Sequence, residues 1–162
     1  MPQTAAQLNP YATFLGTLDP IQVIESTPAT LARLIHGADE ARLTRAPAVG
    51  KWSVRDIISH LADAEIPFAF RLRQTVAEAH HVMQPWDQEL WARHYGTLST
   101  QDALAMFTSL RIWDAQFVRA VGESAMDKVV THPERGQMTF RTIVETMGGH
   151  DINHIRQIEK LV

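Results

Sequence analysis

The sequence contains no cysteine. A disulfide, a thiolate metal ligand and a cysteine nucleophile are therefore excluded, and any sulfur chemistry would need a small-molecule thiol. A basic cluster is also lacking, and the formal net charge is −3 at pH 7. Because nucleic acid and anionic lipid surfaces attract clustered Lys and Arg, we expect neither as a partner.

Long hydrophobic runs are missing as well. No apolar stretch approaches the ~20 residues that a membrane-spanning helix needs. The first seven residues, MPQTAAQ, lack the basic and apolar blocks of a signal peptide. We therefore expect a cytoplasmic protein with no membrane partner. No internal repeat or linker divides the 162 residues, which predicts one domain over residues 1–162, with 1–18 as a lead-in.

Four amphipathic segments carry helix signals. They begin at capping residues, and two of them end at glycine. The predicted helices run from Asp19–Pro20 to Gly37, from Val54 onward, from Ser99 or Thr100 to Gly122, and from Thr139 to the end of the chain. No strand pattern is convincing. Four long amphipathic helices predict an all-α fold, a four-helix bundle.

A long connection, His80–Leu98, lies between the second and third predicted helices. About 17 extended residues could span roughly 55 Å, which is enough to cross the end of a bundle. A long loop with tryptophans and polar groups is often a binding segment. We expect a small molecule to bind between the bundle end and Gln84–Trp91.

Two histidines lie on the apolar face of the last helix. His150 and His154 are four residues apart, so their side chains stack on one helix face about 6 Å apart. They continue an apolar stripe instead of interrupting it; its members are Phe140, Ile143, Met147, Ile158 and Leu161. His60 occupies a core-facing position of the second helix. The sequence therefore directs three histidines inward.

Structural burial and metal binding both place a histidine on an apolar face. Burying three imidazoles without partners costs on the order of 1–3 kcal/mol each, whereas one divalent cation satisfies all three. We therefore predict that His60, His150 and His154 bind a divalent metal. Three protein ligands without cysteine favour an open, catalytic site over a closed structural one. Neutral imidazoles suit zinc, nickel, iron or copper alike.

Other polar residues admit weaker predictions. Asp114 lies on an inner face and could orient a ligand imidazole, and His132 opens a polar turn, His132–Gly136, before the last helix. These two are the candidate catalytic contributors. Four residues are expected to face solvent: Asp63, Glu65, Asp151 and Asn153. The pair Gly148–Gly149, which costs a helix about 2 kcal/mol relative to alanine, is explained equally well by room for a substrate or by close helix packing.

Four segments together resemble the DinB-like superfamily, more closely its YfiT-type branch of metal-dependent hydrolases and bacillithiol transferases. The segments are GKWSVRDIISHLADAE (50–65), PWDQELW (85–91), HPE (132–134) and HDINH (150–154). The resemblance runs from about Thr27 to the C-terminus. It implies an up-down-down-up bundle, commonly a homodimer, with zinc or nickel on His60, His150 and His154. We keep iron and manganese as alternative metals.

The resemblance also implies chemistry. Members of the superfamily use the metal to activate a low-molecular-weight thiol, such as bacillithiol or mycothiol, which agrees with a chain that has no thiol of its own. We expect a metal-dependent thiol S-transferase or hydrolase that acts on a small electrophilic molecule. One alternative is a non-catalytic metal- or ligand-binding stress-response protein. Another is a structural dimeric bundle, which predicts no metal.

Overall fold

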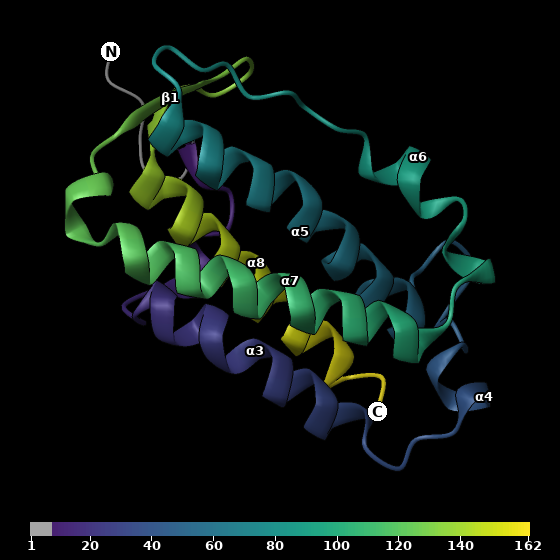
Figure 1. Cartoon of the computed structure of the whole chain (residues 1–162). Coiled ribbons are helices and arrows are strands. Elements are labelled where there is room, and N and C mark those ends of the chain that lie inside the picture. Colours follow the sequence, from purple (N-terminus) through teal and green to yellow (C-terminus); the bar gives the residue numbers. More distant parts are fainter. Residues whose placement is uncertain (1–7) are drawn as a thin grey trace.

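Four long helices form the bundle in the computed structural model, which describes residues 8–162 (Figure 1). They are α3 (Pro20–Ile35), α5 (Val54–Ala77), α7 (Thr100–Val121) and α8 (Phe140–Ile158). The helices α3 and α8 run in one direction and α5 and α7 in the other. The predicted all-α, up-down-down-up four-helix bundle is therefore confirmed.

The starts of the helices follow their capping residues. The Asp19 carboxylate accepts a hydrogen bond from the Ile21 N–H, with Pro20 at the first helical position. Ser53 and Asp56 form a reciprocal capping box at the start of α5. Ser99 caps α7 by accepting a hydrogen bond from the Asp102 N–H, and Thr139 forms a capping box with Thr142 at the start of α8. Local sequence thus sets where each long helix begins.

The connection between α5 and α7 contains the short helix α6 (Gln88–Ala92) and the 3-10 turn η1 (Tyr95–Thr97). Our expectation that it crosses the end of the bundle was wrong. Because α5 and α7 are parallel neighbours, the chain must return along the length of the bundle before α7 begins (Figure 1). Two backbone hydrogen bonds hold the first part of the connection: the Thr131 N–H donates to the His81 carbonyl, and the Met83 N–H donates to the Thr131 carbonyl.

A two-stranded antiparallel hairpin precedes α8, so the expectation of no strands was also wrong. Strands β1 (Val129–His132) and β2 (Gly136–Thr139) pair with His132 opposite Gly136. Each strand has four residues, too few for an alternating pattern to stand out in the sequence. The turn between them is the predicted one, and Gly136 has φ 76° there, a backbone conformation that glycine adopts without a Cβ penalty.

Shorter elements complete the fold. They are α2 (Ala12–Leu15), α4 (Glu40–Leu43) and η2 (Glu123–Ala125). The helix α2 packs against α8, so the described part of the predicted lead-in is a short helix, while residues 1–7 lie outside the described residues. Among residues 8–162, no helix is both long and apolar enough to cross a membrane.

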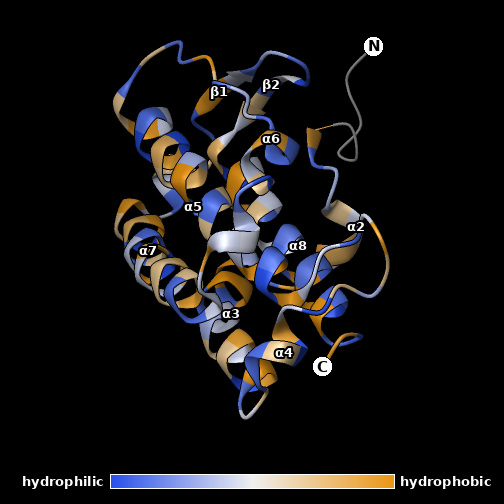
Figure 2. Cartoon of the chain, turned by 90° about the vertical axis from the view of Figure 1, so that its right-hand side faces the viewer, coloured by the Kyte–Doolittle hydropathy of each residue, from blue (hydrophilic) through white to orange (hydrophobic). Residues whose placement is uncertain are grey.

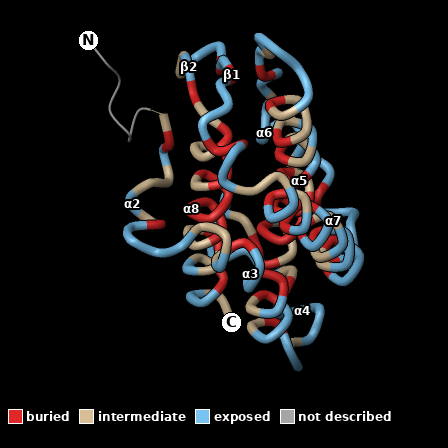
Figure 3. Tube along the Cα trace, turned by 60° about the vertical axis from the view of Figure 1, so that its left-hand side comes forward, coloured by how far each residue is buried: buried red, intermediate tan, exposed pale blue. Residues whose placement is uncertain are grey.

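A polar layer divides the core into two apolar clusters. One cluster contains Phe68, Val118 and Met147, and the other contains Leu61 and Ile158 among their neighbours. The buried faces of the long helices meet in the middle of the bundle (Figure 3), and hydrophilic residues interrupt the apolar surface of α8 (Figure 2). The residues between the clusters are Thr27, His60, Glu65, Arg111, Asp114, His150, Asp151 and His154, all buried. The candidate site lies in this layer.

Candidate metal centre

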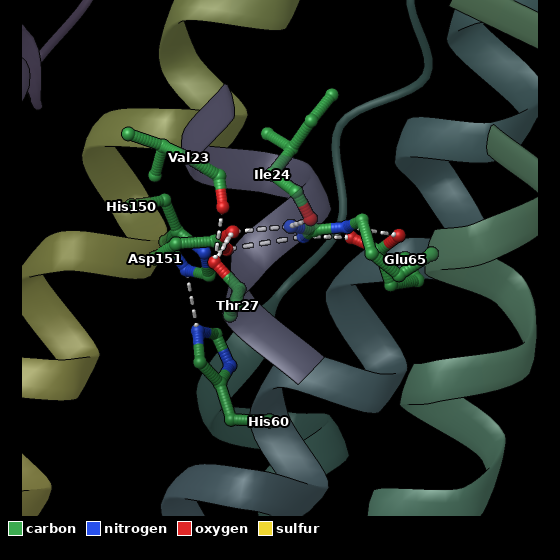
Figure 4. A network of polar contacts seen from close by, with 8 residues as sticks. Val23, Ile24, Thr27, His60, Glu65, His150 and Asp151 are labelled. Carbon is green, nitrogen blue, oxygen red and sulfur yellow. Dashed lines mark hydrogen bonds and ion pairs between the residues drawn. The ribbon is translucent and has the colours of Figure 1, made fainter. Parts of the chain in front are cut away.

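The three predicted ligands converge in one half of the polar layer. His60 comes from α5, and His150 and His154 come from α8. Their side chains are 1%, 5% and 5% exposed, and one ring nitrogen of each lies within 4.8 Å of the others. The Nε2 atoms of His60 and His150 are 2.9 Å apart and point toward one another (Figure 4). Metal binding by this cluster stays a prediction, but the cluster itself is present.

The electrostatics keep these imidazoles neutral. Burial, with a smaller contribution from His154, lowers the pKa of His60 to about 3. Burial also lowers the pKa of His150 well below its ordinary value and that of His154 to a lesser degree. A neutral imidazole keeps a lone pair for a metal, so the rings are in their ligating form.

The hydrogen bonds of the rings select the nitrogen that would bind. His154 Nδ1 lies 3.0 Å from the Oε1 of Gln157, and since an amide oxygen only accepts, Nδ1 carries the proton and Nε2 the lone pair. His60 and His150 face one another through Nε2, and the buried Nδ1 of His60 has no partner among the described residues. Metal–nitrogen distances of about 2.0–2.1 Å place tetrahedral ligand nitrogens roughly 3.4 Å apart. The donor set fits a divalent ion.

Aromatic rings surround the cluster. The ring of Trp52 lies 4.8 Å from that of His60, and Trp86 stacks on the same imidazole at 5.8 Å. Tyr11 contacts His150 edge-on at 5.0 Å. Neither Tyr11 nor Trp52 was predicted to belong to the site, whereas Trp86 lies in the expected binding segment. These rings limit the access of water to the histidines.

Two clefts reach the cluster from different sides. The larger, about 630 Å³, is bordered by His154 and Trp52. The smaller, about 210 Å³, is bordered by His60 and His150. Tyr11 and Gln88 border both clefts. The Gln84–Trp91 segment therefore lies beside the histidines, where a bound small molecule would contact it.

Comparison with known proteins identifies the family. The DinB superfamily matches residues 24–158. The chain belongs to the DinB superfamily. This confirms the resemblance drawn from the four sequence segments. Relatives from Oceanobacillus iheyensis and Bacillus mycoides, both named "Putative metal-dependent hydrolase", are each 26% identical to this DinB protein; the matches cover 87% and 92% of this chain and 83% and 90% of theirs.

A solved structure shares the fold. YfiT from Bacillus subtilis, described as a probable metal-dependent hydrolase with an unusual four-helix bundle topology, superimposes with a TM-score of 0.77. The alignment covers 87% of this chain and 84% of YfiT at 22% identity. At that identity the likeness establishes the bundle topology of this DinB protein and leaves its chemistry to its own residues.

The two candidate catalytic contributors lie in different surroundings. His132, at the end of β1, borders the smaller cleft together with His60 and His150. Asp114 accepts a hydrogen bond from Arg73 at 2.6 Å. Within residues 8–162, no hydrogen bond joins Asp114 to any of the three histidines, so the expected orienting contact is not observed. A catalytic role for His132 stays a prediction.

The other half of the polar layer is an ion-pair network that sequence analysis missed. Glu65 and Asp151, expected to face solvent, are 0% exposed, which makes that expectation wrong. Arg111 lies between them, with its Nη2 2.5 Å from Glu65 Oε1 and 3.0 Å from Asp151 Oδ1. Thr27 donates a further hydrogen bond to Asp151 at 2.8 Å. The guanidinium removes the penalty that a lone buried carboxylate would carry.

The glycine pair allows close packing. A Cβ on Gly149 would lie 2.8 Å from the Cβ of Tyr11 and nearer still to the Tyr11 carbonyl oxygen. A Cβ on Gly148 would lie 3.2 Å from the side chain of Leu15. The packing explanation therefore holds, because the space beside the pair is filled by the α2 segment. Close approach also places Tyr11 against His150.

Proposed function

We propose that this DinB protein is a metal-dependent hydrolase of small molecules. One observation carries the proposal: His60, His150 and His154, three buried imidazoles from two helices, each place a ring nitrogen within 4.8 Å of the others, beside two clefts. The names of the relatives support the same reaction class. A divalent metal bound there would supply Lewis-acid chemistry by lowering the pKa of a coordinated water or thiol.

The composition of the cluster supports an open site. Among the described residues it contains three histidines and no carboxylate. Three ligands leave a position for water or substrate, as in catalytic zinc sites. A carboxylate or amide closing the site would instead favour the non-catalytic metal-binding alternative. Gln157 is directed at His154 Nδ1, the nitrogen away from the ligand position.

The surrounding residues would bind and orient the substrate. His132 Nδ1 accepts a hydrogen bond from the backbone N–H of Glu134 at 3.2 Å, so the neutral ring carries its proton on Nε2. That N–H can donate to a substrate oxygen in the smaller cleft. Trp52 and Trp86 provide apolar walls on either side of His60, which exclude bulk water from the reacting atoms.

Thiol S-transfer is the second candidate. It needs two organic molecules at one site, and the two clefts of about 630 and 210 Å³ meet at the histidines. Since the chain has no cysteine, the thiol would be a cosubstrate. Hydrolysis requires only one of the clefts to hold an organic ligand.

Elemental analysis of untagged protein purified without added metal tests the proposal. We expect about one equivalent of a divalent metal, lost in His60→Ala and retained in the control His94→Ala, which changes an exposed histidine of the connection. The metal-loaded protein is then assayed with 4-nitrophenyl acetate, and with 2-mercaptoethanol plus monochlorobimane, to separate hydrolysis from thiol transfer. Absence of metal, with no thermal stabilisation by zinc, nickel, iron or manganese, would overturn the metalloenzyme proposal.

A further inference from the structure

Two half-buried arginines in the smaller cleft have no carboxylate partner. Arg71 comes from α5 and Arg135 from the hairpin turn, and both border the cleft next to His60 and His150. Neither forms an ion pair among residues 8–162, and residues 1–7 contain no Asp or Glu. The other buried or half-buried arginines each pair with a carboxylate: Arg55, Arg73, Arg111 and Arg141. Among the buried and half-buried arginines of residues 8–162, only Arg71 and Arg135 therefore lack a carboxylate partner, and both lie beside the candidate metal centre.

The donors of Arg71 are only partly used. Its Nη2 donates to the backbone carbonyl of Gln84 at 2.8 Å, which holds the connection against α5. Its Nε is buried with no hydrogen-bond partner among the described residues. Burial and, next, the charge of Arg135 lower the pKa of Arg71. Two like charges in a shared, partly desolvated cleft are costly unless an anion lies between them.

A third donor borders the same cleft. Because His132 Nδ1 accepts a hydrogen bond from the Glu134 backbone N–H, the neutral ring carries its proton on Nε2, which forms no hydrogen bond with another described residue. Glu134, the one carboxylate among the residues that border this cleft, is exposed and forms no ion pair with either arginine. Trp86 and Phe68 supply apolar surface next to these donors. The cleft thus combines two positively charged guanidinium groups and one imidazole N–H with an apolar wall.

We propose that Arg71, Arg135 and His132 form a binding site for an oxyanion, a carboxylate or phosphate group, on the substrate. Guanidinium forks match both groups with paired hydrogen bonds. At roughly 30 Å³ per water-sized volume, a cleft of about 210 Å³ holds on the order of seven such volumes, the size of a short dicarboxylate. The assignment of this anion to the substrate rests on the proposed function, since His60 and His150 form the neighbouring wall.

Metal-free protein provides the first test, because it does not depend on the proposed function. Tryptophan fluorescence, for which Trp86 is a reporter in the cleft, is titrated with succinate, its neutral analogue succinamide, and inorganic phosphate. We expect succinate or phosphate to bind at least about 10-fold tighter than succinamide, as charge-assisted hydrogen bonds to two arginines require. The relative affinities of succinate and phosphate distinguish a carboxylate site from a phosphate site.

Variants assign the effect to the cleft. Arg135→Gln should remove the preference for the anion, and Arg71→Gln should do the same. Because Arg71 also holds the connection, Arg135→Gln is the decisive variant if Arg71→Gln fails to fold. The control is Arg33→Gln, which removes an exposed arginine of α3 that borders neither cleft. If neither succinate nor phosphate binds the wild type more tightly than succinamide, or if the preference for the anion survives in Arg135→Gln, the site is overturned.

Cobalt-loaded protein separates this proposal from the proposed function. Thiolate coordination gives cobalt(II) a charge-transfer band, which is titrated with 3-mercaptopropionate and with its uncharged analogue 3-mercapto-1-propanol. We expect the carboxylate to improve binding about 10-fold in the wild type and not in Arg135→Gln. Binding of both thiols without discrimination would overturn the anion site and leave the metal site intact. If the wild type fails to bind cobalt while the metal-free protein still binds the anion more tightly than its neutral analogue, the metalloenzyme proposal is overturned and the anion site stands.

Discussion

The polar layer of the bundle has two halves that differ in how their polar atoms are satisfied. In the half formed by Glu65, Arg111 and Asp151, every charged group has a partner, and the cleft of about 180 Å³ that Arg111 borders is bordered by neither of these carboxylates. In the half formed by the histidines, Nε2 atoms face each other and the clefts. Both halves are buried, so burial alone does not separate a structural network from a binding site; the ring nitrogens that face one another beside the two clefts do.

The two halves are joined through α8. His150 and Asp151 are adjacent, so the residue that holds α8 to Arg111 lies one position from a candidate ligand. The network therefore fixes the register of α8 against α5, from which His60 projects. We call the half with Glu65, Arg111 and Asp151 the closed half, and the half with His60, His150 and His154 the open half. The closed half positions the open half, so substitutions in the two halves should have different effects.

The largest effect is expected from opening the closed half. Arg111→Met would leave two buried carboxylates unpaired and should lower the free energy of unfolding by about 3–5 kcal/mol, measured by urea denaturation. The matched control adds Glu65→Gln and Asp151→Asn to the same chain, which removes the uncompensated charges and should recover most of the loss. A cost below about 1 kcal/mol for Arg111→Met would show that the network does not hold the bundle.

Substitution in the open half should act mainly through the metal. Zinc at 100 times its Kd should stabilise the wild type by about 2.7 kcal/mol, because it binds only the folded cluster. His150→Ala should abolish that increment, measured as the difference in melting temperature with and without zinc. His94→Ala serves as the control and should keep it. An unchanged zinc increment in His150→Ala would remove that histidine from the ligand set.

Gly149→Ala tests the packing that brings Tyr11 to His150. The added methyl group meets the backbone and Cβ of Tyr11, and overpacking of this kind costs about 1–3 kcal/mol. Gly96→Ala is the control, since its nearest neighbour would be the end of the Arg55 side chain at 3.7 Å. Both are compared by urea denaturation. Equal stability of the two variants would mean that α2 does not press on α8 in solution.

The features that could be predicted from the sequence are those set by residues close together in the chain. Capping residues such as Asp19 and Ser53 located the helices, and the spacing of His150 and His154 placed them inward. Glu65 and Asp151 were assigned to solvent because their partner, Arg111, lies 46 and 40 residues away. A charged residue on a helix reveals nothing about a counter-ion on another helix, so the network needed the tertiary structure.

Other differences have the same origin. The path of the connection between α5 and α7 depends on which helices pack together. Likewise, Trp52 and Tyr11 become parts of the site only through contacts with His60 and His150. The arginines of the smaller cleft were missed because an unpaired charge is recognisable only after all possible partners are located.

The smallest expected effect is the change with pH in the free energy of unfolding of the metal-free protein, which should depend on the histidines of the open half. Burial lowers the pKa of His60 from 6.5 to about 3, so below pH 6.5 the unfolded chain binds a proton that the folded chain does not. Stability should therefore fall as the pH drops from about 6.5 toward 3, by about 1.4 kcal/mol per pH unit for a single histidine. Urea denaturation between pH 7.5 and 5 measures this slope. His60→Gln should lower the slope by about 1.4 kcal/mol per pH unit, which leaves the contributions of His150 and His154, and the control His94→Gln should not change it. A slope unchanged by His60→Gln would show that the His60 ring is protonated in the folded state and that the open half is not the dry, neutral cluster on which the ligand assignment depends.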